Sequence, residues 1–292
     1  MKTAVIILNY CDAENCIQVA LSASNTNLID NVVIVDNCSP DGSIQYLREH
    51  ENGIITVVES KKNGGYAYGY NTGINYALSH FAPDIIFVIN SDIIFEKDLI
   101  NACIEHIEKN PECGVVSSVM LNRDREYDGG YWSFPTYSHL LLRCSWLYRK
   151  FYRKEMKREV KNSVLNVDVI RGSFLCFSSS VLKLVGGFDT NTFLYYEENI
   201  ICKKIKKAGY KVNILTNYTY IHNHKKQENI LWDMSKDFKS AFYYAKTYLE
   251  CNKIQLFFLK YAMKFGVREQ ESVNQLKLIG RRLIHNKKRT NS

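Results

Sequence analysis

Two adjacent acidic residues, Glu197 and Glu198, follow a pair of tyrosines at the predicted start of a helix. A carboxyl group with a raised pKa can act as a general base and remove a proton from an attacking group. Acidic side chains at a helix start are also favoured by the helix dipole, so capping is the alternative. Because neighbouring helix residues point in different directions, we expect only one of the two to reach a site.

A further acidic residue, Asp92, ends the polar sequence Asn90-Ser91-Asp92, which directly follows the apolar run Ile85–Ile89. A carboxylate at the end of a strand is suited to hold Mg²⁺ or Mn²⁺, which prefer oxygen ligands and share them with substrate phosphates. His222 and His224 alternate on an extended segment, so they lie on one face and include a candidate metal ligand. A helix cap for Asp92 and a surface position for the histidines are the alternatives.

The segment 63–73, with the sequence NGGYAYGYNTG, is rich in glycine and opens a predicted helix. Glycines such as Gly64 let the backbone approach a ligand closely, and the N-terminus of a helix favours a phosphate group. The spacing matches neither the GxGxxG dinucleotide motif nor a P-loop. A tight turn with close packing of the helix on a sheet is the alternative.

These candidate residues follow a regular alternation of apolar runs and helical patterns. The runs are Ala4–Leu8, Asn31–Val35, Ile54–Val58 and Ile85–Ile89. Uniformly apolar runs separated by helices predict an α/β fold with a doubly wound, mostly parallel sheet. Ligands bind at the carboxyl ends of the strands in such sheets, and Asn9 and Asp36 follow the first two runs directly.

The second half of the chain predicts further strands and a helical C-terminal region. Strand patterns cover Gly114–Leu121 and Val167–Ser178, and a helix over Tyr196–Ala208 ends at Gly209. From Glu228 onward the pattern is helical, with aromatic residues on one face and Lys or Arg on the other. We therefore expect a catalytic domain over 1–224 and a basic amphipathic helical region over 225–292.

Positive charge is concentrated in two segments of a chain whose net charge is +8. Arg143–Lys161 holds 8 Lys and Arg against 2 acidic residues, and the chain from Lys225 onward holds 15 against 6. An anionic membrane surface and nucleic acid are the two candidate partners for such segments. No nucleic-acid motif is present, so we predict no nucleic-acid partner. For the C-terminal helices, packing on the catalytic domain is the alternative to membrane binding.

The composition also indicates the cellular compartment of the protein. The nine cysteines form no CxxC pair, which indicates reduced thiols in the cytoplasm. No apolar stretch reaches the roughly 18 residues that a membrane span needs, and the N-terminus lacks the pattern of a signal peptide. We predict a cytoplasmic protein, either soluble or peripheral on the inner face of the cell membrane.

The order and spacing of these motifs resemble the family 2 glycosyltransferases, especially the rhamnosyltransferase-like branch of bacterial surface-polysaccharide enzymes. The motifs are VIVDNCSPDGS at 33–43, NGGYAYGYNTG at 63–73, INSD at 89–92, RGSFL at 171–175, VGGFD at 185–189, FLYYEE at 193–198, KKAGY at 206–210 and IH at 221–222. They occur in collinear order over roughly residues 3–224. The resemblance implies the GT-A fold of these enzymes.

The resemblance also implies a role for each matching residue. It assigns the donor nucleotide to Asn9, Asp36, Asn63, Asn71 and Asn90, the metal and diphosphate to Asp92 and His222, and the acceptor side to Gly172. Asn90 stands where the family's DxD motif has its first aspartate, which leaves one carboxylate. Glu198 stands where the family has an aspartate as general base, so the reach of the side chain differs while its ordinary acidity does not.

The predicted function is inverting transfer of a sugar from dTDP-rhamnose or a UDP-hexose to a glycan or lipid-linked acceptor, with Mn²⁺ or Mg²⁺ as cofactor. The acceptor region is predicted over 120–165, where Trp132, Tyr137, Trp146 and Tyr148 are able to stack on sugars. A non-catalytic nucleotide-sugar-binding module and a nucleotidyltransferase are the alternatives. A non-catalytic binding module would not need the acids Asp36, Asp92 and Glu198. A nucleotidyltransferase would need a basic glycine-rich loop after the first strand, and Asn9–Asn15 is not such a loop.

Overall fold

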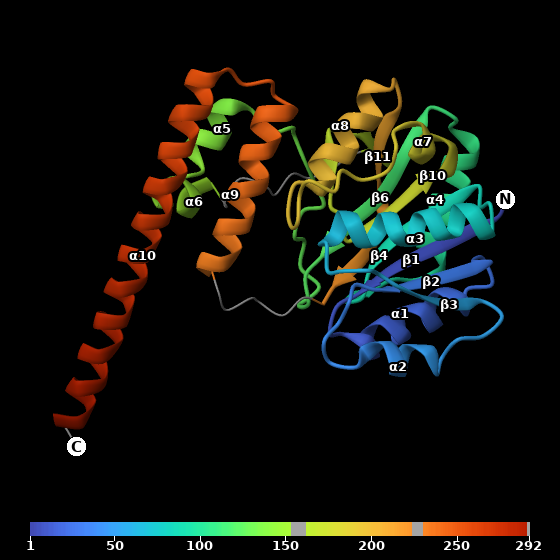
Figure 1. Ribbon diagram of the computed structural model, residues 1–292, viewed down its shortest axis with the longest axis horizontal. Helices are drawn as coiled ribbons and strands as arrows, with labels where there is room; N and C mark the ends of the chain where they lie inside the picture. Colours follow the sequence, from blue (N-terminus) through green and yellow to red (C-terminus); the bar gives the residue numbers. More distant parts are fainter. Residues whose placement is uncertain (153–161, 224–229, 291–292) are drawn as a thin grey trace. The chain divides into compact units, whose positions relative to one another are not determined.

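The computed structural model describes residues 1–152, 162–223 and 230–290. They fall into two compact units, Met1–Phe134 with Lys157–Lys226 and Pro135–Met156 with Gln227–Ser292. The first unit is a sheet with helices on both faces, and the second is helical (Figure 1). The second unit begins close to the predicted boundary at 225, but it also takes in 135–156, which the sequence grouped with the first domain.

The sheet of the first unit has the strand order β3-β2-β1-β4-β10-β6-β11-β5, with β8 paired to β11. The strands are β1 (Thr3–Asn9), β2 (Asn31–Asp36), β3 (Ile55–Glu59), β4 (Ile85–Asn90), β5 (Ile93–Ile94), β6 (Cys113–Leu121), β8 (Val164–Asn166), β10 (Phe174–Ser178) and β11 (Lys211–His222). Strands β3, β2, β1, β4, β6 and β11 run in one direction, and β5, β8 and β10 run against them. The prediction of a mostly parallel sheet is confirmed.

Helices cover both faces because the central strands are apolar on both faces. The helices of this unit are α1 (Ala13–Ser24), α2 (Ser43–Arg48), α3 (Tyr66–His80), α4 (Lys97–Lys109), α7 (Ser179–Leu184) and α8 (Glu197–Lys207). Ile7 and Ile34 belong to a core shared with α1, α2 and α4, whereas Ile6 and Val33 belong to a second core shared with α3, α7 and α8. This alternation of burial is the doubly wound arrangement that the sequence predicts.

Two glycines of the glycine-rich segment serve packing. A side chain at Gly69 would overlap Leu8, and a Cβ at Gly73 would lie 2.5 Å from Ile6 Cγ2. Both positions let α3 lie close against β1. The packing alternative is therefore correct for these two glycines, and only the start of the segment is left to meet a ligand.

The strand predicted over 167–178 is interrupted. Residues Val169–Ile170 form β9, which pairs with β7 (Tyr131–Trp132) in a small antiparallel sheet, and β10 begins only at Phe174. The three residues between them, Arg171–Ser173, pass the carboxyl end of β4, where Asn90 N donates to Ser173 O at 3.0 Å. The interruption thus brings Gly172 to the edge of the sheet that carries the predicted site.

In the part of the second unit that the structure describes there are four helices: α5 (Tyr137–Leu142), α6 (Trp146–Tyr152), α9 (Ile230–Thr247) and α10 (Lys253–Thr290). Helix α5 ends at Leu142 and α6 begins at Trp146, so the helical stretch is broken between them. Arg143, at the break, forms an ion pair with Asp237 of α9 at 2.6 Å. Among the helices that the structure describes, none combines the length and apolar composition needed to cross a bilayer.

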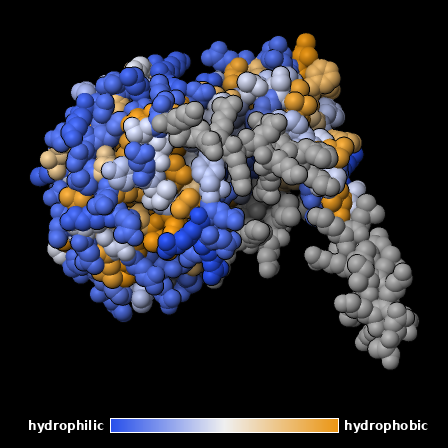
Figure 2. Space-filling model, turned by 180° about the vertical axis from the view of Figure 1, so that it is seen from behind, coloured by the Kyte–Doolittle hydropathy of each residue, from blue (hydrophilic) through white to orange (hydrophobic). Residues whose placement is uncertain are grey.

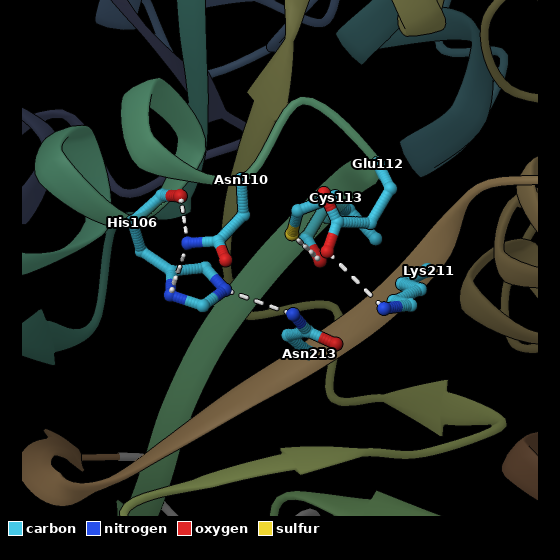
Figure 3. A network of polar contacts seen from close by, with 7 residues as sticks. His106, Asn110, Glu112, Cys113, Lys211 and Asn213 are labelled. Atoms are coloured by element: carbon cyan, nitrogen blue, oxygen red, sulfur yellow. Dashed lines mark hydrogen bonds and ion pairs between the residues drawn. The ribbon is translucent and has the colours of Figure 1, made fainter.

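At the end of the sheet where β6 and β11 begin, polar side chains bind one another (Figure 3). Asn213 Nδ2 donates to His106 Nε2 at 2.8 Å, which requires a neutral imidazole ring. Lys211 Nζ lies 3.1 Å from Glu112 Oε1, with both side chains about half exposed. We call these four residues the starting-edge network. It lies at the opposite end of the strands from Asn9, Asp36 and Asn90.

Candidate active site

The predicted polar residues at the strand ends lie side by side. Asn9 is in register with Asp36, and Leu8 is in register with Asn90. Asn9 Nδ2 donates to Asp36 Oδ1 at 2.7 Å, and both side chains are fully buried. The three strand ends therefore form one continuous polar row across β2, β1 and β4.

Asp36 organises the loop after β2. Its Oδ1 accepts a hydrogen bond from Ser39 Oγ at 2.6 Å, and its Oδ2 accepts one from Ser39 N at 3.0 Å. Ser39 Oγ in turn accepts from Cys11 N at 3.1 Å, so the loops after β1 and β2 are joined. Asp36 and Asn9 thus hold the loops after β1 and β2 together. Contact of either side chain with a nucleobase stays a prediction.

The start of the glycine-rich segment is fixed to a segment distant in the sequence. Gly65 has a φ of 83°, and a Cβ at this position would overlap the carbonyl oxygen of Phe193. Tyr66 N donates to this same oxygen at 3.2 Å, and Asn37 Nδ2 donates to Asn63 Oδ1 at 3.1 Å. The contacts hold Asn63 and Gly64 beside the chain that leads to the paired glutamates.

Asn71 binds protein backbone through both atoms of its amide. Nδ2 donates to Phe188 O at 2.8 Å, and Oδ1 accepts from Phe188 N at 2.9 Å. Asn71 therefore joins α3 to the turn after α7. A contact of Asn71 with the donor stays a prediction.

Asn90 is held by a buried tyrosine. Tyr70 Oη donates to Asn90 Oδ1 at 2.6 Å. Burial raises the pKa of Tyr70 well above its ordinary value, and nearby Tyr66, Glu197 and Asp92 act in the same direction. Tyr70 therefore remains a neutral hydrogen-bond donor over the working pH range and fixes the amide of Asn90.

Asp92 and His222 meet across two paired strands. Antiparallel pairing of β5 with β11 sets His222 opposite Ile93, next to Asp92. Asp92 Oδ1 lies 3.1 Å from His222 Nε2, and both side chains are about one-fifth exposed. Asp92 is no helix cap, because Glu96 precedes α4. His224 lies outside the described residues.

The donor atoms of this pair fit a divalent cation. A carboxylate oxygen and an imidazole nitrogen are both ligands that Mn²⁺ accepts, and Mg²⁺ is bound by few protein groups with water and substrate phosphates completing its shell. Within the described ranges, no group of three or more His, Cys, Asp or Glu residues is arranged to hold a metal ion.

The paired glutamates follow a strained turn. Tyr195 and Tyr196 have φ values of 68° and 70°, in the left-handed region that non-glycine residues rarely adopt. Glu197 and Glu198 then form the first turn of α8. Burial, and next the negative charge of Glu198, raise the pKa of Glu197 well above its ordinary value. The pair thus favours one negative charge rather than two.

The carboxylates converge around Tyr66. Burial raises the pKa of Tyr66 to about 12, and the charges of Asp92, Glu197 and Asp12 act in the same direction. These three acids come from the loop after β4, the start of α8 and the loop after β1. Residues far apart in the sequence therefore form one acidic site at the carboxyl ends of the strands.

The predicted acceptor residues lie near Glu198. A Cβ at Gly172 would meet only Glu198 Cβ, at 3.8 Å, so this glycine leaves space beside the catalytic candidate. Trp132 Nε1 donates to Asn199 Oδ1 at 2.9 Å, one residue after Glu198. Tyr137, Trp146 and Tyr148, also proposed for the acceptor, belong to the second unit, and 153–161 of the basic segment lie outside the described residues.

One residue of this region, Arg171, was not predicted from the sequence to belong to the site. The guanidinium group of Arg171 lies over the Trp132 ring, 5.2 Å from its centroid, and its Nε is buried without a hydrogen-bond partner in the described structure. Its position directly before Gly172 in the RGSFL motif was the available signal. Trp132 and Arg171 form a cation–π pair next to the paired glutamates.

Comparison with known proteins gives consistent matches. The sequence model of the glycosyl transferase family 2 matches residues 5–174, more than half of the chain. A low-salt glycan biosynthesis hexosyltransferase, Agl10 of Haloferax volcanii, is 26% identical over 75% of this chain and 66% of its own length. An N-acetylglucosaminyl-diphospho-decaprenol L-rhamnosyltransferase of Mycobacterium tuberculosis is 22% identical over 62% of each chain. This chain spans less than two thirds of the length of either relative.

A solved structure supports the fold. The mannosyltransferase PcManGT from Pyrobaculum calidifontis, in complex with GDP-Man and Mn²⁺, aligns with a TM-score of 0.60 and 18% identity. The alignment covers 97% of this chain and 80% of that one. The predicted GT-A fold, with its helical C-terminal region, is confirmed.

Proposed function

Because this chain belongs to glycosyl transferase family 2, we propose that it transfers a sugar from a nucleoside-diphosphate sugar to a glycan or lipid-linked acceptor, with inversion at the anomeric carbon. The observation that carries the proposal is the convergence of Asp92, His222 and the Glu197–Glu198 pair on one edge of the sheet. This edge is where ligands bind in open α/β sheets.

Glu198 is the proposed general base. Glu198 lies beside the space at Gly172, and burial together with the charge of Glu198 raises the pKa of Glu197, so the pair favours a single negative charge. An acceptor hydroxyl in that space would lose its proton to Glu198 as it attacks the anomeric carbon from the face opposite the leaving diphosphate. A single displacement of this kind inverts the configuration, through a transition state with oxocarbenium character.

Asp92 and His222 are the residues that would hold Mn²⁺ or Mg²⁺. A bound divalent cation would offset the negative charge that builds on the leaving diphosphate. Asn90, fixed by Tyr70, stands at the same strand end and is proposed to contact the donor. Because Asn90 is uncharged, the site holds one acidic residue fewer than a DxD site.

The donor nucleotide is proposed to lie along the polar row at the strand ends. Asn9 and Asp36 shape the loops that would surround the base, and Asn63 and Gly64 would face the diphosphate. Asn71 joins α3, which follows this loop, to the turn after α7 through Phe188. The donor sugar is proposed to be rhamnose on dTDP or a hexose on UDP.

The acceptor is proposed to reach Glu198 past Trp132 and Gly172. The hydrogen bond of Trp132 to Asn199 fixes the orientation of the indole ring next to Glu198, and the guanidinium group of Arg171 lies over that ring. We further propose that the acceptor belongs to surface-polysaccharide synthesis and that the protein works in the cytoplasm, peripherally on the inner face of the cell membrane.

A thermal-shift screen tests the donor site. Purified protein is mixed with UDP, dTDP or GDP and with Mn²⁺, Mg²⁺ or EDTA, since a ligand of the folded state raises the melting temperature. We expect one nucleotide to raise it only with metal present. The Asp92→Asn variant should lose the metal-dependent part, whereas Asp98→Asn, an exposed acid of α4, should retain it.

Two results would contradict the proposal. The absence of any nucleotide effect in folded protein would count against the donor site. A metal-dependent shift without sugar transfer to any glycan or lipid-linked acceptor would point instead to a non-catalytic binding module.

A further inference from the structure

Helix α10 packs on its own unit through one face. Leu259, Met263, Gly266 and Gln270 are all buried and are spaced by three or four residues, which sets them in line along the helix. A Cβ at Gly266 would overlap the backbone oxygen of Cys144, so the helix approaches the α5–α6 segment closely. This face accounts for the contacts of α10 with α5, α6 and α9.

The opposite face of α10 is also apolar, yet it is exposed. Its side chains are Ile254, Phe257, Phe258, Tyr261 and Phe265, with exposed fractions between 55% and 69%. At 3.6 residues per turn, they lie about half a turn away from the buried face. Hydrophobic side chains are visible on the surface of the helical unit in Figure 2. We call these five residues the aromatic stripe.

The aromatic stripe is a continuous surface rather than a set of isolated side chains. The ring centroids of Phe257 and Tyr261 are 4.5 Å apart, and those of Phe257 and Phe258 are 5.7 Å apart. A contiguous exposed apolar patch marks a surface that another body covers. Because the packing of α10 uses its other face, the stripe is not needed to fold the second unit.

Exposed lysines beside the aromatic stripe indicate which kind of partner binds it. Lys253, Lys260 and Lys264 lie along one side of it, and Lys264 Nζ is 5.7 Å from the Tyr261 ring centroid. A second copy of the chain would bring like charges together at this surface, which disfavours pairing. An anionic lipid surface offers an apolar layer for the rings and negative headgroups for the lysines.

We propose that the aromatic stripe of α10 is a membrane-binding surface for anionic lipid. The helix lies in the plane of the interface, with the stripe entering the boundary of headgroups and acyl chains and the lysines binding the headgroups. The proposal rests on the stripe and its charges, not on the proposed transfer reaction, and it needs no membrane-spanning helix.

Vesicle flotation with the full chain tests this surface. We expect the protein to float with vesicles of phosphatidylcholine mixed with phosphatidylglycerol and to bind phosphatidylcholine alone at least about 10-fold more weakly. The Phe257→Ser/Phe265→Ser variant should weaken binding to the mixed vesicles about 10-fold or more, because it removes apolar area from an exposed face. Lys253→Glu/Lys260→Glu/Lys264→Glu should do the same by removing charge attraction.

The control is Leu21→Ser/Leu184→Ser, two exposed apolar residues of the first unit, which should bind like the parent protein. Parent-like vesicle binding by the stripe variant would overturn the proposal. So would a dimer in light scattering that becomes a monomer in the stripe variant, because a second copy would then be the partner. Vesicle binding requires no nucleotide, so its outcome is independent of the thermal-shift screen.

Discussion

The two ends of the parallel strands differ in how their polar groups are held. In the starting-edge network, His106 and Asn213 bind each other, and Glu112 and Lys211 form an exposed ion pair (Figure 3). At the carboxyl edge, the partly buried Glu197 carries a raised pKa and two successive tyrosines have left-handed backbone conformations. We call the end with the raised pKa of Glu197 and the two successive left-handed tyrosines the strained end and the other the relaxed end, where single left-handed residues, Asn27 and Ala82, precede β2 and β4.

The difference shows where this fold tolerates unfavourable energy. A non-glycine residue in the left-handed region costs of order 1–3 kcal/mol, and a buried carboxyl group resists ionisation. Such costs persist where the surrounding structure determines the conformation and where function benefits from it. The apolar strands between the two ends supply that surrounding structure.

The largest expected effect comes from Glu198→Gln at the strained end. Loss of the general base should lower the rate of sugar transfer by about 10³-fold, within the usual range for such a residue. Donor binding should remain close to that of the parent, because glutamine keeps the size and polarity of the side chain. Transfer assays and nucleotide thermal shifts measure the two quantities separately.

Glu197→Gln is the matched control for this variant, since it removes the neighbouring carboxyl group. We expect it to retain far more activity than Glu198→Gln. Greater loss in Glu197→Gln would reverse the assignment of the two glutamates. Loss of donor binding in Glu198→Gln would exclude a simple role as base.

The next effect is on stability and concerns Gly65→Ala. The new side chain would adopt an unfavourable φ and overlap the oxygen of Phe193, so we expect a loss of about 3 kcal/mol of unfolding free energy. Gly53→Ala is the control, because a Cβ there meets nothing within 4 Å. Urea denaturation should separate the two variants clearly. Equal stability would show that the loop at Gly65 adapts, which would remove the rigidity proposed for this part of the site.

A smaller effect is the pH dependence caused by Glu197. Because its folded pKa is raised, its contribution to stability is present below the ordinary value of 4.5 and is lost as the pH rises towards the folded value. Glu197→Gln should therefore match the parent near pH 4 and exceed it increasingly above that, by at most about 1.4 kcal/mol per pH unit. Urea denaturation across pH measures this, and Glu49→Gln, at an exposed site, controls for the lost charge. A constant difference across pH would contradict the assignment.

Much of the relaxed framework could be predicted from the sequence. The strands β1, β2 and β4 are buried on both faces, so each is a plain apolar run with a polar residue at its end. Local patterns report such features directly.

The strained end was harder to predict because it depends on contacts between distant segments. The two-residue strands β7 and β9 have no pattern of their own and exist through pairing with each other. Arg171 approaches Trp132 because β7 pairs with β9, and Asp92 approaches His222 because β5 pairs with β11. The family resemblance assigned Asp92 and His222 to one metal site, whereas the contact of Arg171 with Trp132 was not predicted.

The smallest effect tests the relaxed end, through His106. Burial lowers the pKa of His106, partly offset by the charge of Glu112, so its contribution to stability is present above the ordinary value of 6.5 and is lost as the pH falls through the folded value. His106→Gln keeps an acceptor for Asn213 but does not titrate. It should equal the parent at pH 8 and be more stable by about 1 kcal/mol or less at pH 5.

His106→Leu removes that acceptor and leaves a buried amide of Asn213 without it, so it should be less stable than His106→Gln by about 1 kcal/mol at every pH. Urea denaturation at several pH values resolves the two variants. The trend with pH is opposite in sign to that of Glu197, since one end of the sheet weakens in acid and the other as the pH rises. If His106→Gln followed the acid dependence of the parent, the ring would not be the titrating group, and the contrast between the two ends would rest on the carboxylates alone.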